Sequence, residues 1–368
     1  MGGGARPAAA TVTAAARRGW ASSRRFLRRL CGAAAVALLG ATTLPAAAAG
    51  EPKRTDLIID LPSAGDLAAP ATGQTLFVID GADGSVTGID PFEPAKRWTA
   101  LAAPASDTRR SVAVACIDTT NLAVLCEDRA GWSLRVHGVR PGVAADPEKP
   151  VQSVSLGAAA PAGGPAESPS APVVPCLAVS PSRDWLAVCS LPPPAFPLLR
   201  ATIQGARVGT ASDRGCPPIP ADSRPCAATI TPADELILFT TKREARPDAD
   251  VFVTFHRLPD PRRLLHLDTG LAAIRDAALC RGDGTLWVVG GTPGSATVPE
   301  GLWRLDAAFR ERRQAVQPVL IARLDAPRAV CCLSERAIVV THGATRRIVS
   351  LFEWSRNDAP PSERSDQP

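Results

Sequence analysis

Ten cysteines give this chain its most reactive side chains. None of them is spaced C-x-x-C, the arrangement typical of zinc sites and redox motifs. Cys176 and Cys189 flank a short turn at 181–184, and counting outward from that turn places them opposite each other on neighbouring strands. Cys216 and Cys226 border a proline-rich segment that a bridge would close. The spacing therefore predicts these two pairs as possible disulfides.

Three further cysteines, Cys116, Cys280 and Cys332, each lie six residues before a leucine or isoleucine that opens an apolar run. We expect them at equivalent positions on the first strands of their three repeats. A small buried side chain suits a crowded centre, and this explanation is favoured over a metal or redox cluster. The same outward counting places Cys116 opposite Ala123.

Histidine and carboxylate residues do not form a recognisable catalytic pattern. The four histidines sit in or at the ends of expected strands and share no metal-binding spacing. His342, at the end of a second strand and followed by Gly343, is the one best placed for a site, because strand ends open onto loops. Asp118, Asp234 and Asp283 lie near expected turns, and turn preference accounts for them. We therefore predict no catalytic, metal-binding or cofactor-binding residues, and no cofactor. The histidines are His137, His256, His266 and His342.

The elements that carry these residues repeat along the chain. An apolar run, a small polar turn and a second apolar run recur six times, with spacings of 46, 64, 50, 50 and 52 residues between the leading residues of the second runs. Periods in this range with several short strands per unit indicate the blades of a β-propeller. The longest spacing contains a low-complexity Ala/Pro/Gly loop at about 157–173. The leading residues are Leu76, Leu122, Leu186, Leu236, Leu286 and Ile338.

The two ends of the repeat region predict how the ring closes. The sixth unit offers a strand at 346–354 and then lacks one outer strand, whereas 57–61 forms a strand before the first unit. Pairing these strands would close a single all-β propeller of six blades and remove its open edges. A seventh, degenerate blade and a pair of β-sandwiches are the alternatives, and 305–316 suits a short helix as well as a strand.

The N-terminal segment predicts export. Residues 1–49 hold seven arginines and no acid. Within this segment the arginines come first, and an apolar stretch at 31–44 and small residues spaced A-x-A follow them, which is the pattern of a signal peptide cleaved after Ala49. Ser23–Arg28 resembles the twin-arginine export motif. We expect a periplasmic or secreted protein that contacts a membrane only if the signal is retained. The domains are then 1–49 as signal, 50–354 as propeller and 355–368 as a disordered tail.

Without that segment the basic excess disappears. The chain has 41 basic and 36 acidic residues, and removing seven arginines leaves 34 against 36, a net charge of −2. A nucleic-acid partner is therefore not expected.

Two of the repeated phrases carry a family resemblance. LAVSPSRDWLAVCS at 177–190 and ALCRGDGTLWVVGG at 278–291 resemble the inner hairpin of WD-like and YVTN-type β-propeller repeats in exported bacterial proteins. Ser85–Trp98 is similar to one repeat of the pyrroloquinoline-quinone type, a pattern that the other units do not repeat.

These features favour an exported propeller that acts as a binding or scaffold module. Its partner would be a protein or glycan bound through long loops at one mouth of the ring, at 161–175 and 191–224. The alternatives are a propeller enzyme of the lactonase or quinoprotein type, which would need polar groups converging on the axis, and a structural cell-envelope protein. Enzymatic activity is uncertain and less favoured.

Overall fold

The described part of the chain consists of strands joined by turns. In this computed structural model the described residues are 51–61, 65–105, 109–157, 175–189, 198–202, 207–210, 219–220, 222–242, 250–258, 262–281, 284–305, 317–344 and 347–355. Within these ranges no helix is long and apolar enough to cross a membrane.

The described strands form six four-stranded antiparallel sheets, which we number I to VI. Sheet I contains β2 (Leu67–Ala68), β3 (Leu76–Ile79), β4 (Val86–Ile89) and β5 (Arg97–Leu101). Sheet II contains β6 (Arg110–Cys116), β7 (Asn121–Asp128), β8 (Gly131–Gly138) and β9 (Gln152–Gly157). Sheet III contains β10 (Cys176–Val179), β11 (Trp185–Cys189), β12 (Leu198–Thr202) and β13 (Arg207–Thr210).

The second half of the chain supplies the other three sheets. Sheet IV contains β14 (Ser223–Ile230), β15 (Glu235–Lys242), β16 (Asp250–Arg257) and β17 (Arg262–Ala272). Sheet V contains β18 (Asp276–Leu279), β19 (Leu286–Gly290), β20 (Gly301–Leu305) and β21 (Pro318–Arg323). Sheet VI contains β22 (Ala329–Ser334), β23 (Ala337–His342), β24 (Arg347–Glu353) and β1 (Lys53–Leu61).

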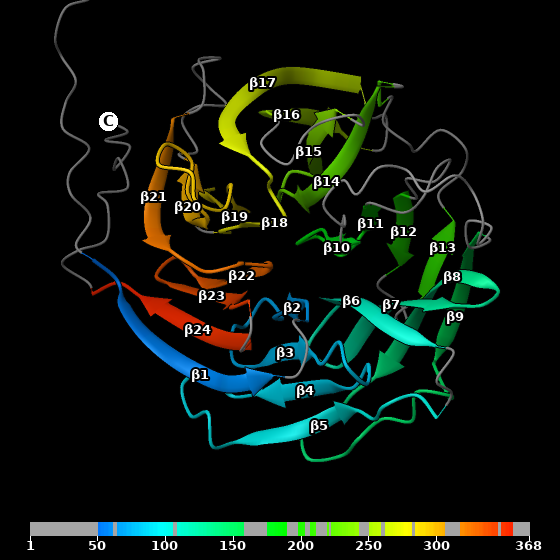
Figure 1. The fold of residues 1–368 in the computed structure, drawn as a ribbon. Coiled ribbons are helices and arrows are strands. Elements are labelled where there is room, and N and C mark those ends of the chain that lie inside the picture. The colour runs from blue at the N-terminus through cyan, green and yellow to red at the C-terminus, as the bar shows by residue number, and fades with distance from the viewer. Residues whose placement is uncertain are drawn as a thin grey trace, which may run out of the picture. The chain divides into compact units, whose positions relative to one another are not determined.

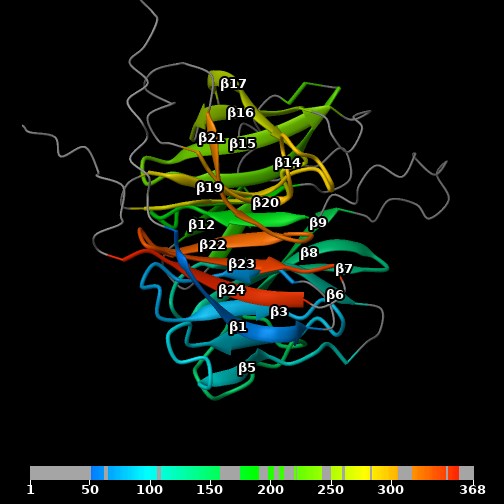
Figure 2. The same cartoon turned by 60° about the vertical axis from the view of Figure 1, so that its left-hand side comes forward.

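The sheets are arranged around a common axis as a β-propeller (Figure 1). The first strands of the repeats, β2, β6, β10, β14, β18 and β22, contact one another in that order, and β22 also contacts β2. The strand β1 pairs antiparallel with β24, from Lys53 opposite Glu353 to Leu61 opposite Arg347. Figures 1 and 2 show β1 along β24 in both views. The prediction of a single all-β propeller is confirmed.

Packing between sheets explains the continuous apolar runs. On β3, Leu76 and Val78 pack in a cluster with residues of sheet VI, whereas Phe77 and Ile79 pack in a cluster with residues of sheet II. Because alternate side chains of a strand point to opposite faces, a strand buried on both faces is apolar at every position. All four residues of β3 are buried.

The strand register agrees with the sequence in one hairpin and departs from it in another. Cys176 lies opposite Cys189, as predicted. The predicted pairing of Cys116 with Ala123 is wrong, because Cys116 lies opposite Leu122. The backbone N–H of Ile117 bonds to the carbonyl of Asn121, so the turn between them has three residues and the register moves by one.

Several sequence predictions fall outside the described residues. These are the signal segment 1–49, most of the loop at 157–173, the helix or strand alternative over 306–316 and the tail from 356 onward.

Candidate functional site

Two buried carboxyl groups join neighbouring sheets near the axis. Asp66 Oδ1 accepts a bond from the N–H of Leu67 at 2.9 Å, and Oδ2 accepts one from Val114 of sheet II at 3.0 Å. Asp276 repeats the arrangement, with Oδ1 accepting from Ala277 at 2.8 Å and Oδ2 from Val330 of sheet VI at 2.8 Å. Each aspartate therefore satisfies a backbone donor of the next first strand in the ring.

These carboxyl groups belong to one level of the propeller. Six residues stand ten positions before the leading residues of the second runs, and five of them line a small cavity of about 30 Å³, here called the axial cavity. It holds little more than one water molecule. The cavity lies where the first strands begin, and we call this end the strand-start mouth. The six residues are Asp66, Val112, Cys176, Cys226, Asp276 and Arg328, and all except Cys226 line the cavity.

Burial dominates the electrostatics of the axial cavity. It raises the pKa of Asp66 to about 7, although the two backbone N–H groups partly oppose the change. Burial also raises the pKa of Asp276 well above its ordinary value, and the charge of Asp66 raises it further. Two such carboxyl groups resist being ionised together, which favours protonation of at least one below neutral pH.

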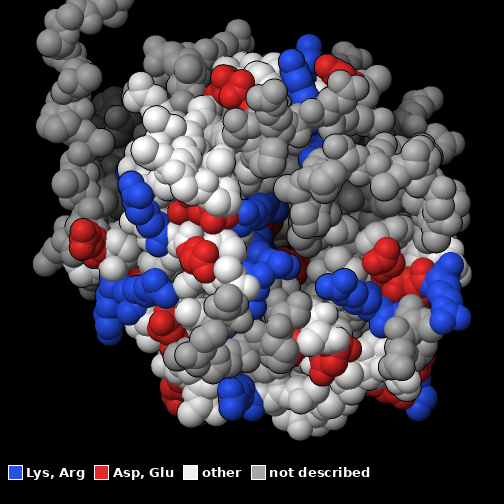
Figure 3. Space-filling view, in the orientation of Figure 1, with Lys and Arg blue, Asp and Glu red and all other residues white. Residues whose placement is uncertain are grey.

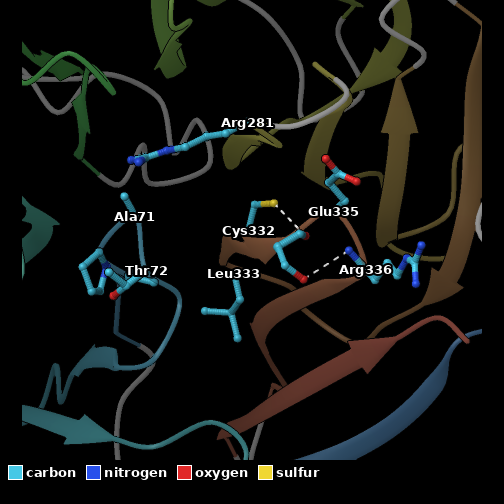
Figure 4. A pocket seen from close by; sticks show the side chains of 10 residues that line it. Ala71, Thr72, Arg281, Cys332, Leu333, Glu335 and Arg336 are labelled. Carbon is cyan, nitrogen blue, oxygen red and sulfur yellow. Dashed lines mark hydrogen bonds between the residues drawn. The ribbon is translucent and has the colours of Figure 1, made fainter. Parts of the chain in front are cut away.

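A second and larger cavity opens at the opposite end of the first strands. It has a volume of ≈ 570 Å³ and lies against the β2–β3 and β22–β23 turns, and we call this end the turn mouth. Figure 4 shows Arg281 on one side of the opening and Glu335 and Arg336 together on another, with Thr72 and Leu333 also lining it. The remaining lining residues are Ala69, Pro70, Ala71, Cys332 and Ser334.

Three free thiols lie near this end. Burial raises the pKa of Cys116, and Cys331 raises it further, whereas the charge of Arg281 lowers it. Burial and the charges of Asp276 and Asp66 raise the pKa of Cys331 to about 12. Cys332 Sγ donates to the carbonyl of Ser334 at 3.2 Å. The high pKa values make Cys116 and Cys331 poor nucleophiles at neutral pH.

The residues predicted to form disulfides are placed as follows. Cys176 and Cys189 are buried neighbours on β10 and β11, and both are free thiols, so their bridge stays a prediction. Cys226 is a buried free thiol whose Sγ donates to the carbonyl of Phe239 at 3.4 Å. Cys216 lies outside the described residues, and the second pair is not tested.

The histidines lie in the sheets and not in the cavities. On β23, His342 Nε2 lies 2.8 Å from Ser350 Oγ and 3.2 Å from a guanidinium nitrogen of Arg54, and the Ser350 hydroxyl donates to Asp56 at 2.6 Å. Although this arrangement contains Asp, Ser and His, Ser350 is fully buried and its hydroxyl donates to the carboxylate. It cannot present a nucleophile to a substrate and instead connects β1, β24 and β23. Burial lowers the pKa of His342 to about 4.

Asp118 and Asp234, the two described acids near the inner turns, accept hydrogen bonds from turn residues. Asp118 Oδ1 accepts bonds from the N–H and hydroxyl of Thr120 at 2.7 and 2.9 Å. Asp234 Oδ1 accepts from Ser182 of sheet III at 2.7 Å and so joins two sheets. Asp283 lies outside the described residues. Within those residues, no group of three or more His, Cys, Asp and Glu is arranged to hold a metal ion.

The sequence analysis missed Asp66, Asp276 and Arg328. One signal could have found them, because each stands ten residues before a leading residue, as Cys176 does. A shared spacing places residues at one level of the ring. The spacing alone does not show that side chains from sheets I, V and VI meet there, because the ring brings them together.

The fold defines the chain as a β-propeller protein. No protein-family model and no curated protein matches the sequence. Among similar solved structures are a gluconolactonase from Xanthomonas campestris (13% identity, 86% of this chain and 94% of that chain, TM-score 0.51) and the PQQ-bound form of an aldose sugar dehydrogenase from Streptomyces coelicolor (13%, 82% and 98%, TM-score 0.51). A third is the Cps50 (Swd1) β-propeller domain of Myceliophteria thermophila (12%, 79% and 97%, TM-score 0.48). At these identities the likeness to the gluconolactonase and the dehydrogenase shows a common fold.

Proposed function

We propose that this chain is an exported binding module, a six-bladed propeller closed by β1, which takes a protein or glycan partner at the turn mouth. This differs from the partner site predicted from the sequence, the loops at 161–175 and 191–224, most of which lie outside the described residues. The observation that supports it is the open cavity of ≈ 570 Å³ at that end. Cavities of this size hold a ligand or a few residues of a partner.

The chemistry of the lining suits a polar partner with small apolar parts. Arg281, Glu335 and Arg336 offer charges of both signs around the opening. Thr72 and Ser334 add hydroxyl groups, and alanine, proline, leucine and cysteine side chains form the remainder. Mixed charges with a partly apolar floor are typical of surfaces that bind peptides or sugars.

Peptide and glycan arrays with the purified protein test this function. We expect Arg281→Ala and Glu335→Arg to weaken binding of the best array ligand by about tenfold, the effect of losing one charged contact. Arg97→Ala, on the exposed outer strand β5, is the control and should bind normally. Equal binding by all the variants would exclude the turn mouth.

The second candidate function is catalysis at the axis. Its support is the pair Asp66 and Asp276, which converge on the axial cavity. Both oxygens of each carboxyl group already accept backbone bonds, which leaves them poorly placed to act on a substrate. The segment Ser85–Trp98, which resembles a quinone-type repeat, belongs to the outer strands β4 and β5 of its sheet and the turn between them.

Assays with gluconolactone, and with aldoses plus added pyrroloquinoline quinone, test the enzymatic alternative. We expect neither activity. Turnover that Asp276→Asn abolishes would establish the enzyme and remove the binding module as the main function.

Export through residues 1–49 is part of the proposal. Full-length protein produced in a bacterial host should appear outside the cytoplasm without these residues, as mass spectrometry of its N-terminus can determine. Arg24→Lys with Arg25→Lys should block export if the twin-arginine route is used. Retention of the segment would favour the structural cell-envelope alternative.

A further inference from the structure

The strand-start mouth collects arginines from several sheets. Arg275 and Arg328 immediately precede β18 and β22 and line the axial cavity, and Arg110 is the first residue of β6. First strands run in the same direction around a propeller, so these three residues lie at one end. On the face drawn in Figure 3, Lys and Arg side chains gather near the middle of the ring.

Only one of these three arginines has its charge matched. Arg275 donates to the carbonyl of Pro327 at 2.7 Å and forms an ion pair of 2.5 Å with Glu300. Arg347, which lies nearby, donates to the carbonyls of Ala326 and Gly343. The half-buried side chain of Arg328 has no hydrogen bond or ion pair with the described residues, and neither does the exposed side chain of Arg110.

The surroundings of Arg328 are repulsive. Burial lowers the pKa of its guanidinium, and the charges of Arg347, Arg275 and Arg110 lower it further. The two acids that line the axial cavity do not compensate, because their oxygens are bonded to backbone N–H groups and burial raises both pKa values. A partly buried cation among like charges is stabilised by an external anion.

We propose that the strand-start mouth is a second binding site that takes one oxyanion, a phosphate, sulfate or carboxylate group, with Arg328 as its main ligand and Arg110 as a second. The planar guanidinium donates two parallel bonds to such groups. The axial cavity below, at about 30 Å³, is too small for a larger ligand, so the anionic group must sit at its opening. This site is independent of the proposed partner site at the turn mouth.

Calorimetric titration with inorganic sulfate and phosphate, against chloride at equal ionic strength, tests the site. We expect one saturable site in the full chain. Arg328→Gln should weaken it by about tenfold or more, Arg328→Lys should retain part of the affinity, and Arg110→Gln should weaken it severalfold. Arg97→Gln on β5 is the matched control and should bind as the unaltered protein does.

Thermal unfolding separates binding from folding. Because Arg328→Gln removes a repelled charge, its melting temperature without oxyanion should equal or exceed that of the unaltered protein. Sulfate should raise the melting temperature of the unaltered protein and leave that of Arg328→Gln unchanged. The proposal would be overturned if no saturable binding is seen. It would also be overturned if Arg328→Gln and Arg110→Gln both bind the oxyanion as tightly as the unaltered protein does.

A sulfated oligosaccharide distinguishes the sources of the oxyanion. Binding at least tenfold tighter than inorganic sulfate would assign the group to a polymer, and equal binding would assign it to a free ion; both support the site. Arg281→Ala at the turn mouth should leave the oxyanion affinities and the melting temperatures unchanged. The oxyanion site can therefore be tested even if the proposed partner site at the turn mouth proves wrong.

Discussion

At the scale of single residues, Asp66 and Asp276 join the backbones of neighbouring sheets, which a turn or surface aspartate does not do. Each bonds a backbone N–H of its own strand and another of the next sheet. We expect Asp66→Ala and Asp276→Ala each to reduce the free energy of unfolding by about 1–3 kcal/mol, because a buried N–H loses its acceptor. Asp250→Ala, on the exposed end of β16, should change it by less than about 0.5 kcal/mol. Urea unfolding measures all three, and equal stability would exclude the role in joining sheets.

His342 predicts a loss of stability in acid. Its pKa is about 4 in the fold and about 6.5 when unfolded, so between these values the unfolded chain binds the additional proton. The stability that the neutral histidine contributes should therefore decrease as the pH falls from about 6.5 to about 4. His342→Gln should lose less stability than the unaltered protein between pH 7 and pH 5 in urea unfolding.

Other titrating groups set the background for that comparison. His137, with its pKa lowered to about 4 by burial, acts in the same direction, whereas the raised pKa of Asp66 favours the fold in acid. Because the unaltered protein and His342→Gln share these groups, the difference between their stability changes with pH comes from His342 alone. Ser350→Ala removes its partner but keeps its burial, and should retain the pH dependence. An identical pH profile in His342→Gln would show that the residue does not titrate on unfolding.

At the scale of elements, much of the strand pattern follows from the sequence. Each leading residue lies at the first or second position of the second strand of its sheet, from Leu76 in β3 to Ile338 in β23. The leading residues mark these strands correctly because strands buried on both faces must be apolar throughout. Register is harder, as Cys116 shows, because one residue fewer in a turn moves every pair on the hairpin. Contacts across the axis depend on six registers together, which is why the arginines of the strand-start mouth were not predicted.

The pairing of β1 with β24 makes a specific prediction about that element. β1 contributes Ile58 to the core between sheets VI and I, together with the Asp56 and Arg54 contacts to sheet VI. Deleting residues 51–61 should reduce the free energy of unfolding by at least about 2–5 kcal/mol, the cost of one buried isoleucine, and should leave β24 as an open edge. A synthetic peptide of residues 51–63 should restore the melting temperature by adding the strand in trans. A deletion variant as stable as the full chain would remove the proposed closure.

At the scale of the whole molecule, the state of the cysteines depends on the cellular compartment in which the chain folds. Cys176 and Cys189 face each other on adjacent strands, where Cα atoms lie about 4.5–5.5 Å apart, within the range of a disulfide. Burial raises the pKa of Cys189, and a bond from Cys176 raises it further, so neither attack on small reagents nor oxidation is expected in the folded chain. A bridge would therefore form during folding, in an oxidising compartment.

Thiol titration after unfolding measures this directly. Protein purified from the periplasm or medium should show two fewer thiols than protein produced in the cytoplasm for each bridge formed. Cys176→Ser should abolish the difference that this pair contributes, and Cys126→Ser, at a buried thiol opposite Ser111, should preserve it. If exported protein retains all nine thiols that follow residue 49, neither predicted bridge forms, and Cys176, Cys189 and Cys226 serve as small buried core residues.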